Sequence, residues 1–291
     1  MLVTIHSSRP IGGSITAPPS KSMAHRAVLC AALATGSSHI TNLEFSKDIS
    51  ATLAAAGQLC ARVTTGPADA VVEGLGRFAP LTAPVDCCES GSTLRFLIPI
   101  ASLTGQEVTF TGRGRLMERP QSVYETLYRE QDLRFEQTSA GLTVAGALTP
   151  GEYRLAGNVS SQFFTGLLFA LPLLGGGSTL VSTTRLESRD YVAMTRDALA
   201  RAGVKIDGEA ERFAVPPSVY RFFDAAVEAD WSQAGFWYAV RFLGNGVEVC
   251  GLNENSAQGD RVVKDLLERF KAAGEQSVDV SDCPDLLPPL A

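Results

Sequence analysis

The sequence has little charge and no long apolar run. Only 19% of its 291 residues are charged, and the formal net charge is −6 at pH 7. This acidic balance disfavours nucleic acid as a partner, so basic residues that gather locally would serve a small anionic ligand. No apolar stretch reaches the roughly 18 to 20 residues of a membrane span, and the amino terminus has no charged segment followed by an apolar core. We expect a soluble protein that handles a metabolite.

Cysteine motifs typical of disulfide or metal frameworks are also absent. The six cysteines are scattered, and none belongs to a Cys-x-x-Cys motif or lies at metal-ligand spacing from a histidine. This distribution is typical of reduced thiols in a cytosolic chain. It predicts a cytoplasmic protein with neither a disulfide framework nor a metal site.

An internal repeat dominates what the sequence does contain. A segment of small hydroxyl residues, an apolar helix, a glycine break and a β-like stretch recurs about every 70 residues. The copies begin at Pro19, Glu89, Asn158 and Ala229. An amphipathic helix with an acidic start follows each copy, as the helix dipole favours. The pattern predicts an α/β (α+β) fold of repeated βαβαββ units whose apolar helices are buried.

The first copy places cations where a helix begins. Lys21 and Arg26 open the apolar run, although the first turn of a helix already carries partial positive charge. A bound phosphate or carboxylate would resolve this conflict, because converging N–H groups, hydroxyls and cations make an anion site. The third copy opens with Ser160, Ser161 and Gln162. We therefore expect helix N-termini from several repeats to surround one anionic ligand.

These motifs resemble the 5-enolpyruvylshikimate-3-phosphate synthase (3-phosphoshikimate 1-carboxyvinyltransferase) family. The resemblance runs from the first expected strand to the last residue, through PSKS with Arg26, SGST-x-R, ERP, VSSQF, ESRDY and DCPD. It implies the enolpyruvyl transferase fold. It also implies transfer of the enolpyruvyl group of phosphoenolpyruvate to the 5-hydroxyl of shikimate 3-phosphate, with release of phosphate. This step belongs to the shikimate pathway of chorismate and aromatic amino acid biosynthesis, and it implies no cofactor or metal.

The resemblance also implies roles for matching residues. Those expected at phosphoenolpyruvate are Lys21, Gly91, Arg119 and Gln162. Those expected at shikimate 3-phosphate are Lys21, Ser22, Arg26, Ser160, Ser161, Gln162, Ser188 and Asp285, with Tyr191 as a further contact. Asp285 is expected to be the catalytic residue that accepts the proton of the 5-hydroxyl.

Local sequence alone also allows plainer roles for several of these residues. Ser160, Ser188 and Asp285 have the residue type and position of helix caps, and Arg119 before a proline could be a solvated cation. We expect Asp230, which matches another acidic position of the family, to be structural. His25 is close in sequence to the expected site, but we assign it no chemistry.

The sequence departs from the family pattern at two places. Glu89 and Ser92 stand where the family usually has asparagine and threonine. A carboxylate at position 89 would repel an anionic ligand unless another group compensates its charge. After Tyr128 the glycine that normally ends the helix is absent, so another residue must end it.

We expect residues 20–228 to form a complete lobe of three repeats, and residues 1–19 with 229–291 to form part of a second lobe. Family members continue beyond the last residue with further site residues, so we expect this chain alone to be inactive and its intact parent to be a monomeric enzyme. Two alternatives stay open. The chain could be a non-catalytic ligand-binding fragment, or it could belong to the UDP-N-acetylglucosamine enolpyruvyl transferases, although it lacks their lysine-asparagine pair and loop cysteine.

Overall fold

The chain forms two compact units in a computed structural model that describes residues 10–209, 211–272 and 274–291. Unit 1 comprises Met1–Ser20 and Glu228–Ala291, and unit 2 comprises Lys21–Val227. Residues 1–9 of the expected second lobe lie outside the described residues. That one unit is a complete lobe and the other an incomplete one stays a prediction.

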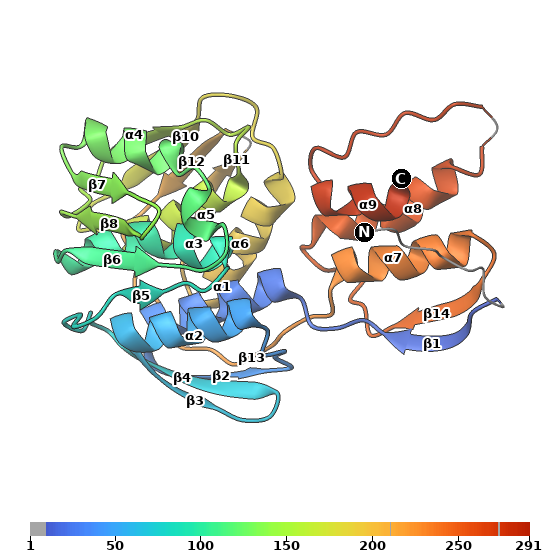
Figure 1. Cartoon of the computed structure of the whole chain (residues 1–291), viewed down its shortest axis with the longest axis horizontal. Helices are drawn as coiled ribbons and strands as arrows, with labels where there is room; N and C mark the ends of the chain where they lie inside the picture. Colours follow the sequence, from blue (N-terminus) through green and yellow to red (C-terminus); the bar gives the residue numbers. More distant parts are fainter. Residues whose placement is uncertain (1–9, 210, 273) are drawn as a thin grey trace. The chain divides into compact units, whose positions relative to one another are not determined.

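Unit 2 contains the βαβαββ unit three times (Figure 1). The first copy contains α1 (Lys21–Leu33), β2 (Thr35–Thr41), α2 (Lys47–Leu59), β3 (Ala61–Thr65) and β4 (Asp69–Leu75). The second contains β5 (Val85–Asp86), α3 (Gly91–Ala101), η1 (Ser102–Thr104), β6 (Val108–Thr111), η2 (Leu116–Glu118), α4 (Ser122–Glu130), β7 (Arg134–Gln137) and β8 (Leu142–Ala145). The third contains β9 (Glu152–Leu155), α5 (Ser161–Ala170), η3 (Leu171–Leu173), β10 (Ser178–Ser182), α6 (Arg189–Arg201), β11 (Asp207–Glu209) and β12 (Arg212–Val215). The repeat seen in the sequence is therefore confirmed as a structural repeat.

The first strand of the first copy comes from a distant part of the chain. It is β13 (Ala225–Ala226), which pairs with β2 in parallel, Ala225 opposite Ile40. The strand that precedes α1 in sequence, β1 (Gly12–Thr16), instead pairs in parallel with β14 (Gly246–Cys250) of unit 1. A simple tandem order would place β1 in unit 2 with α1, and β13 in unit 1 with α7. In the structure β1 belongs to unit 1 and β13 to unit 2.

Three four-stranded sheets share one topology. Their orders are β13-β2-β4-β3, β5-β6-β8-β7 and β9-β10-β12-β11. In each sheet the first pair is parallel and the next two pairs are antiparallel. Antiparallel sheets can bury one face and leave the other in solvent, which gives the alternating burial seen along β4 and β10.

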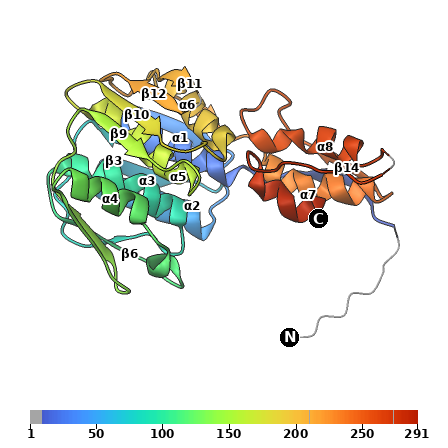
Figure 2. The ribbon, with the colours of Figure 1, turned by 90° about the horizontal axis from the view of Figure 1, so that it is seen from above.

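The helices α1, α3 and α5 form the centre of unit 2, with the sheets around them (Figures 1 and 2). Nearly every residue of α5 is buried, because its apolar side chains cover all of its faces. The contacts link α3 to α5, α5 to α6, α6 to α1, α1 to α2 and α2 to α3. Phe96 of α3 meets Phe169 of α5 edge to face, with ring centroids 5.7 Å apart. The expectation of buried apolar helices is confirmed.

An aspartate ends α4 in place of the usual glycine. Asp132 adopts a left-handed backbone conformation with φ of 56°. Asparagine and aspartate tolerate this conformation better than other residues that carry a Cβ. The Leu133 N–H then donates to the Tyr128 carbonyl at 2.8 Å, which caps the last turn.

Unit 1 packs a short set of helices on its two-stranded sheet. These are α7 (Trp231–Phe242), η4 (Gly259–Val262), α8 (Val263–Arg269), η5 (Pro284–Leu286) and α9 (Leu287–Leu290). Trp231 is fully buried in a cluster with Val263 and Leu286. The Asp230 carboxylate caps α7 by accepting from the Gln233 N–H at 2.8 Å, which is the structural role expected for it.

One face of α7 lacks cover from the part of the chain that the structure describes. Phe236 is 46% exposed, Phe242 37% and the following Leu243 77%. The apolar composition of this helix would otherwise predict burial on all sides. Among the described residues no helix has the length and apolar character to cross a membrane. None of the six cysteines forms a disulfide.

Candidate functional site

The inner helices of unit 2 begin close together. They start at Lys21, Gly91 and Ser161, about 70 residues apart in sequence. Side chains of their first turns contact one another or the neighbouring outer helices, so the three N-termini lie at the same end of unit 2. The first N–H groups of each helix have no intrahelical partner, and the helix dipole is positive at that end.

Serine caps occupy two of these starts. The Ser90 hydroxyl accepts from the Thr93 N–H at 3.1 Å at the start of α3. The Ser160 hydroxyl accepts from the Gln162 N–H at 3.3 Å at the start of α5. The helix-cap role that the local sequence allowed for Ser160 is therefore confirmed. The N–H groups of Gly91 and Ser161, which come first in their helices, are not used by these caps.

Gly91, Arg119 and Gln162 meet at one point. A Cβ added to Gly91 would lie 3.1 Å from Arg119 Nη1 and 4.0 Å from Gln162 Oε1. Three residues from separate motifs are thus brought together, as the resemblance implies. Glycine leaves the space that lets both side chains approach the helix start.

Arg119 owes its position to its neighbours in sequence. The residue before a proline is disfavoured in the helical region, and Arg119 accordingly ends η2 with φ of −69° and ψ of 128°. Its carbonyl accepts hydrogen bonds from Gln137 Nε2 at 2.9 Å and from Gln121 Nε2 at 3.3 Å. The backbone is therefore fixed while the side chain remains exposed.

Arg95 is a site residue that the sequence interpretation missed. Its Nη1 donates to Gln162 Oε1 at 2.6 Å and its Nε donates to Gln121 Oε1 at 3.2 Å. The guanidinium lies over the Phe163 ring, 4.9 Å from the centroid. Burial lowers the pKa of Arg95, and the nearby charge of Arg119 acts in the same direction. Its signal in the sequence was the arginine that ends SGST-x-R, to which no role was assigned.

Arg95 and Arg119 form no ion pair with a carboxylate among the described residues. Two neighbouring cations beside two helix N-termini make this region electropositive. Gln162 lies between these groups, because its Nε2 also donates to Ser92 Oγ at 2.9 Å. The arrangement is suited to an anion that bears several oxygens.

Lys21, by contrast, has an acidic partner. Its Nζ lies 2.8 Å from Asp48 Oδ2 at the start of α2, and the two side chains are 55% and 25% exposed. An exposed pair of this kind contributes at most about 1 kcal/mol. Lys21 can therefore exchange this carboxylate for a ligand anion at little cost.

Arg26 lies inside unit 2 and is only 2% exposed. It donates to the carbonyls of Ser22 and Tyr191 at 2.7 and 2.9 Å and to Thr195 Oγ1 at 3.0 Å. Burial lowers its pKa to about 10, so it remains a cation at neutral pH. Its acceptors are protein atoms in this structure, and its contact with a ligand stays a prediction.

A buried chain of hydrogen bonds joins α1, α2 and α3 near their N-terminal ends. His25 Nδ1 lies 2.7 Å from Thr52 Oγ1, and Thr52 Oγ1 lies 2.7 Å from Thr93 Oγ1. Thr93 donates in turn to Ser90 Oγ at 2.7 Å. Burial lowers the pKa of His25 to about 3, so its imidazole is neutral at physiological pH. His25 therefore positions the helix starts and does not titrate at neutral pH.

Ser188 has an unusual backbone. It precedes α6 with φ of 54°, a left-handed conformation that is uncommon for residues with a Cβ. Its carbonyl accepts from the Tyr191 N–H at 3.0 Å, and no hydrogen bond from its side chain caps the helix. Strain of this sort concentrates at functional sites. The cap role that local sequence allowed for Ser188 is thus not seen.

Two further predicted residues, Ser161 and Asp285, belong to different units of the chain. Ser161 is buried in the first turn of α5. Asp285 lies in η5 of unit 1 and is exposed. The structure brings together Gly91, Arg119 and Gln162, while the ligand roles of all the predicted site residues stay predictions.

The departure at Glu89 has a local explanation. Its Oε1 would lie 3.1 Å from a Cβ on Gly114, so the side chain lies against the turn at residues 113–114. Arg113 pairs with Asp86 at 2.9 Å, and the charge of Glu89 acts on it more weakly. Glu89 therefore shares this cation with Asp86, and only a small part of its negative charge is offset.

Comparisons with known proteins concern the family and the fold of the chain. The family model described as EPSP synthase (3-phosphoshikimate 1-carboxyvinyltransferase) matches residues 5–286. A 3-phosphoshikimate 1-carboxyvinyltransferase of Clostridium kluyveri is 42% identical over 298 residues, which cover 96% of this chain and 70% of that protein. The protein of the same name from Clostridium beijerinckii is 39% identical over 305 residues, with the same shares.

A solved structure shares the fold. An EPSP synthase from Acinetobacter baumannii superposes with a TM-score of 0.77 at 20% identity, and the match covers 92% of this chain and 61% of that one. The chain thus spans about three fifths of the solved relative. The enolpyruvyl transferase fold expected from the sequence is confirmed, and the relatives do not favour the UDP-N-acetylglucosamine branch. The chain belongs to the EPSP synthase (3-phosphoshikimate 1-carboxyvinyltransferase) family.

Proposed function

We propose that this chain serves the transfer of the enolpyruvyl group of phosphoenolpyruvate to the 5-hydroxyl of shikimate 3-phosphate. The observation that carries the proposal is the meeting of Gly91, Arg119 and Gln162 at the N-termini of α3 and α5. The names of the relatives support the same reaction. It belongs to the shikimate pathway of aromatic amino acid biosynthesis, and we place it in the cytoplasm.

The proposed substrates explain the electrostatics of the site. Each is a phosphorylated carboxylate, so holding both together requires several negative charges to be offset. Arg95, Arg119 and Lys21 supply positive charge, and the helix N-termini add N–H donors. Arg26 is a buried cation without an ion-pair partner among the described residues. An anionic ligand near α1 would supply its missing counter-charge.

The two substrates divide the residues between them. Phosphoenolpyruvate contacts Lys21, the Gly91 N–H, Arg119 and Gln162 in this proposal. Shikimate 3-phosphate contacts Lys21, Ser22, Arg26, Ser160, Ser161, Gln162 and Ser188, and Tyr191 is a further contact. The buried hydrogen bonds from His25 to Ser90 hold the N-terminal ends of α1, α2 and α3 in fixed positions relative to one another.

The chemistry proceeds by addition and elimination. The 5-hydroxyl oxygen bonds to C2 of phosphoenolpyruvate, its proton passes to a base, and the methylene carbon gains a proton. The tetrahedral intermediate then loses a proton from the methyl carbon as the bond to phosphate breaks. We propose Asp285 as the base on the resemblance alone, since a carboxylate suits that task. Positioning the two substrates removes much of the entropic barrier.

A second hypothesis is that the 291-residue chain binds ligands without turning them over. The exposed apolar face of α7 favours it, because Phe236 and Leu243 lie uncovered by the described residues. Helices of this composition normally pack against further elements. In this case unit 2 would retain the contacts with the substrate phosphates. We propose that the intact enzyme is a monomer and supplies the residues needed for turnover.

Calorimetry and a phosphate-release assay separate these hypotheses. We expect shikimate 3-phosphate to bind the chain, Lys21→Ala to weaken both ligands, and Ser161→Ala to weaken mainly shikimate 3-phosphate, each by about tenfold. Lys205→Ala and Ser50→Ala are matched controls, because both residues are exposed and lie outside the cluster. Binding with turnover supports the enzyme, and binding without turnover supports the ligand-binding chain. Unchanged affinity in both Lys21→Ala and Ser161→Ala would refute the site itself.

A further inference from the structure

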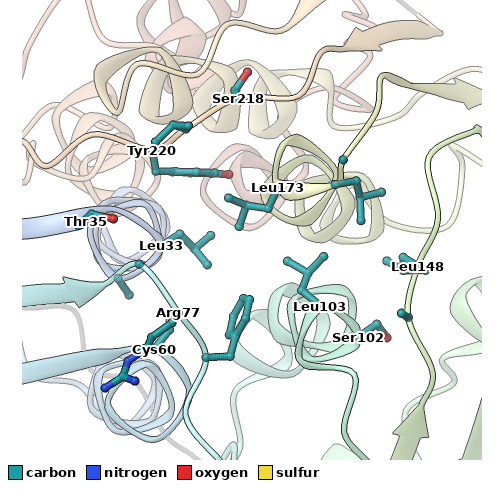
Figure 3. A pocket seen from close by; sticks show the side chains of 17 residues that line it. Leu33, Thr35, Cys60, Arg77, Ser102, Leu103, Leu148, Leu173, Ser218 and Tyr220 are labelled. Carbon is teal, nitrogen blue, oxygen red and sulfur yellow. The ribbon is translucent and has the colours of Figure 1, made fainter.

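A cavity of about 450 Å³ opens at the opposite ends of the three inner helices (Figure 3). It is lined by Leu33 at the end of α1, Leu103 in η1 after α3, and Leu173 in η3 after α5. Helix α1 has 13 residues, so the cavity lies about 20 Å from the N-terminal cluster. It is therefore distinct from the proposed substrate site.

The repeat explains why the cavity exists. Leu33, Leu103 and Leu173 occupy equivalent positions of the three copies, at the same interval of about 70 residues that separates the helix starts. Their side chains point toward a common centre in Figure 3. Three helix ends that converge in this way leave a space on their common axis, which the side chains only partly fill.

The floor of the cavity is largely apolar. Leu148 is 4% exposed, Leu174 8% and Tyr220 2%. The Tyr220 hydroxyl already donates to the Phe169 carbonyl at 2.8 Å, so it presents mainly its ring. A volume of several hundred Å³ with an apolar floor is typical of sites for small organic ligands. The apolar part of a ligand would therefore gain free energy on this floor.

The charge around the cavity is one-sided. No carboxylate lies among the described residues that line it, and Arg77 lies at its margin (Figure 3). Arg77 is exposed and forms no ion pair with the described part of the chain. An exposed guanidinium without a partner is free to turn toward a carboxylate, which it can bind through two parallel hydrogen bonds.

The helix ends do not outweigh this cation. A helix C-terminus carries about half a negative charge, which attracts cations only when its carbonyls are unpaired. Here the Ala101 carbonyl accepts from Thr104 Oγ1 at 2.7 Å, and the Pro172 carbonyl accepts from the Ser218 N–H at 2.7 Å. The partial negative charge that remains at the helix C-termini disfavours an anion on the floor of the cavity. At the margin, the positive charge of Arg77 favours one. A fitting ligand thus has an apolar body and a single terminal anion.

We propose that this cavity binds a small amphipathic carboxylate, with an aromatic or branched aliphatic body on the leucine floor and its carboxylate at Arg77. Nothing in the proposed reaction requires this site. Because the same three helices carry the substrate contacts at their other ends, the ligand would occupy the opposite side of the same helical core.

Methyl NMR of the full chain with 13C-labelled leucine tests the proposal. The probe is 3-phenylpropanoate, compared with 3-phenylpropan-1-ol and 3-phenylpropylamine. We expect the carboxylate to shift the methyl signals of Leu33, Leu103 and Leu173 and to bind at least threefold more tightly than the alcohol, with the amine weakest. Arg77→Gln should reduce the affinity for the carboxylate to that for the alcohol and leave the alcohol unaffected.

A filled cavity provides the second arm. Leu103→Trp should lower probe affinity at least tenfold, and Arg62→Gln, a change of an exposed arginine outside the cavity, should leave it unchanged. If Leu103→Trp does not fold, Arg77→Gln alone decides the charge preference. Probe binding that leaves these leucine methyls unshifted, or no binding at millimolar probe, would overturn the proposal. Equal affinity for carboxylate and alcohol, with no effect of Arg77→Gln, would overturn it as well.

Discussion

Arg95 Nη1 donates a hydrogen bond of 2.6 Å to Gln162 Oε1, across two helices whose starting residues lie about 70 residues apart. This bond orients the Gln162 amide so that its Nε2 reaches Ser92. It joins the SGST-x-R and VSSQF motifs into one structure. The anion site that we propose for unit 2 is built around it.

Gln162→Ala should destabilise unit 2 and weaken ligand binding together. The change removes the acceptor of the half-buried Arg95 guanidinium, and an unpaired buried donor costs about 1 to 3 kcal/mol. Urea unfolding measures the stability, and calorimetry with shikimate 3-phosphate measures the affinity. Gln58→Ala is the control, because its side chain is partly exposed and makes only a 3.4 Å contact with the Pro84 carbonyl. Unaltered stability and affinity in Gln162→Ala would show that the bond has no such role.

Gly91→Ala should impair the phosphoenolpyruvate contacts more than those of shikimate 3-phosphate. The new Cβ would lie 3.1 Å from Arg119 Nη1, so the guanidinium must move by a few tenths of an ångström. If the chain catalyses the reaction, we expect its KM for phosphoenolpyruvate to rise about tenfold. If it only binds ligands, we expect its Kd for phosphoenolpyruvate to rise by the same factor. Gly57→Ala is a matched helical control, because its Cβ meets only Val63 Cγ2 at 3.9 Å. A larger effect on shikimate 3-phosphate than on phosphoenolpyruvate would contradict the division of contacts.

His25 should make the stability depend on pH. Burial lowers its pKa to about 3 in the folded chain, against about 6.5 in the unfolded chain. The unfolded chain therefore binds a proton first as the pH falls, and stability is lost between about pH 6.5 and pH 3. We expect the free energy of unfolding to fall by about 2 kcal/mol between pH 7 and pH 5 from this group alone.

The His25→Asn variant should flatten that dependence in urea unfolding at the two pH values. His39→Asn is the control, since His39 is exposed and bonded to Asp69 at the surface. If His25→Asn retained the full difference between pH 7 and pH 5, the burial of a neutral imidazole would not be its cause.

Asp48→Asn should strengthen anion binding at low salt. The Asp48 carboxylate competes with a ligand for Lys21 Nζ, from which it lies 2.8 Å. Its neutralisation should raise the affinity for shikimate 3-phosphate two- to threefold at low ionic strength, and the gain should vanish in 0.5 M NaCl through screening. Stability should change by less than about 1 kcal/mol. A weaker affinity at low salt would mean that Asp48 orients Lys21 for the ligand.

The sequence predicted the repeat, the buried helices and the cluster of helix N-termini because all three depend on short local patterns. Small hydroxyl residues followed by an apolar run mark the start of each inner helix, and the structure places α1, α3 and α5 accordingly. The contact of Gly91 with Arg119 and Gln162 followed only from the resemblance. No local pattern states which distant side chains meet.

Other features could not be predicted from the sequence, because they depend on contacts between distant parts of the chain. The exchange of β1 and β13 between units depends on long-range strand pairing, which neither strand's own residues encode. The burial of Arg26 was not foreseen, since an arginine at a helix start normally stays in solvent. The left-handed Ser188 and the role of Arg95 depend on tertiary contacts. The aspartate that ends α4 shows how a missing glycine can be replaced.

The most direct test of the central claim is 15N–1H NMR of the chain during titration with shikimate 3-phosphate. The claim is that the backbone N–H groups at the starts of α3 and α5 bind the anionic substrates. We expect the amide signals of Ser161 and Gln162 to shift with one common affinity, and that of Gly91 to shift further when phosphoenolpyruvate is added, while those of Gly57 and Gly105 stay in place. Saturation binding of shikimate 3-phosphate that leaves the amides of Ser161 and Gln162 unshifted would contradict the account.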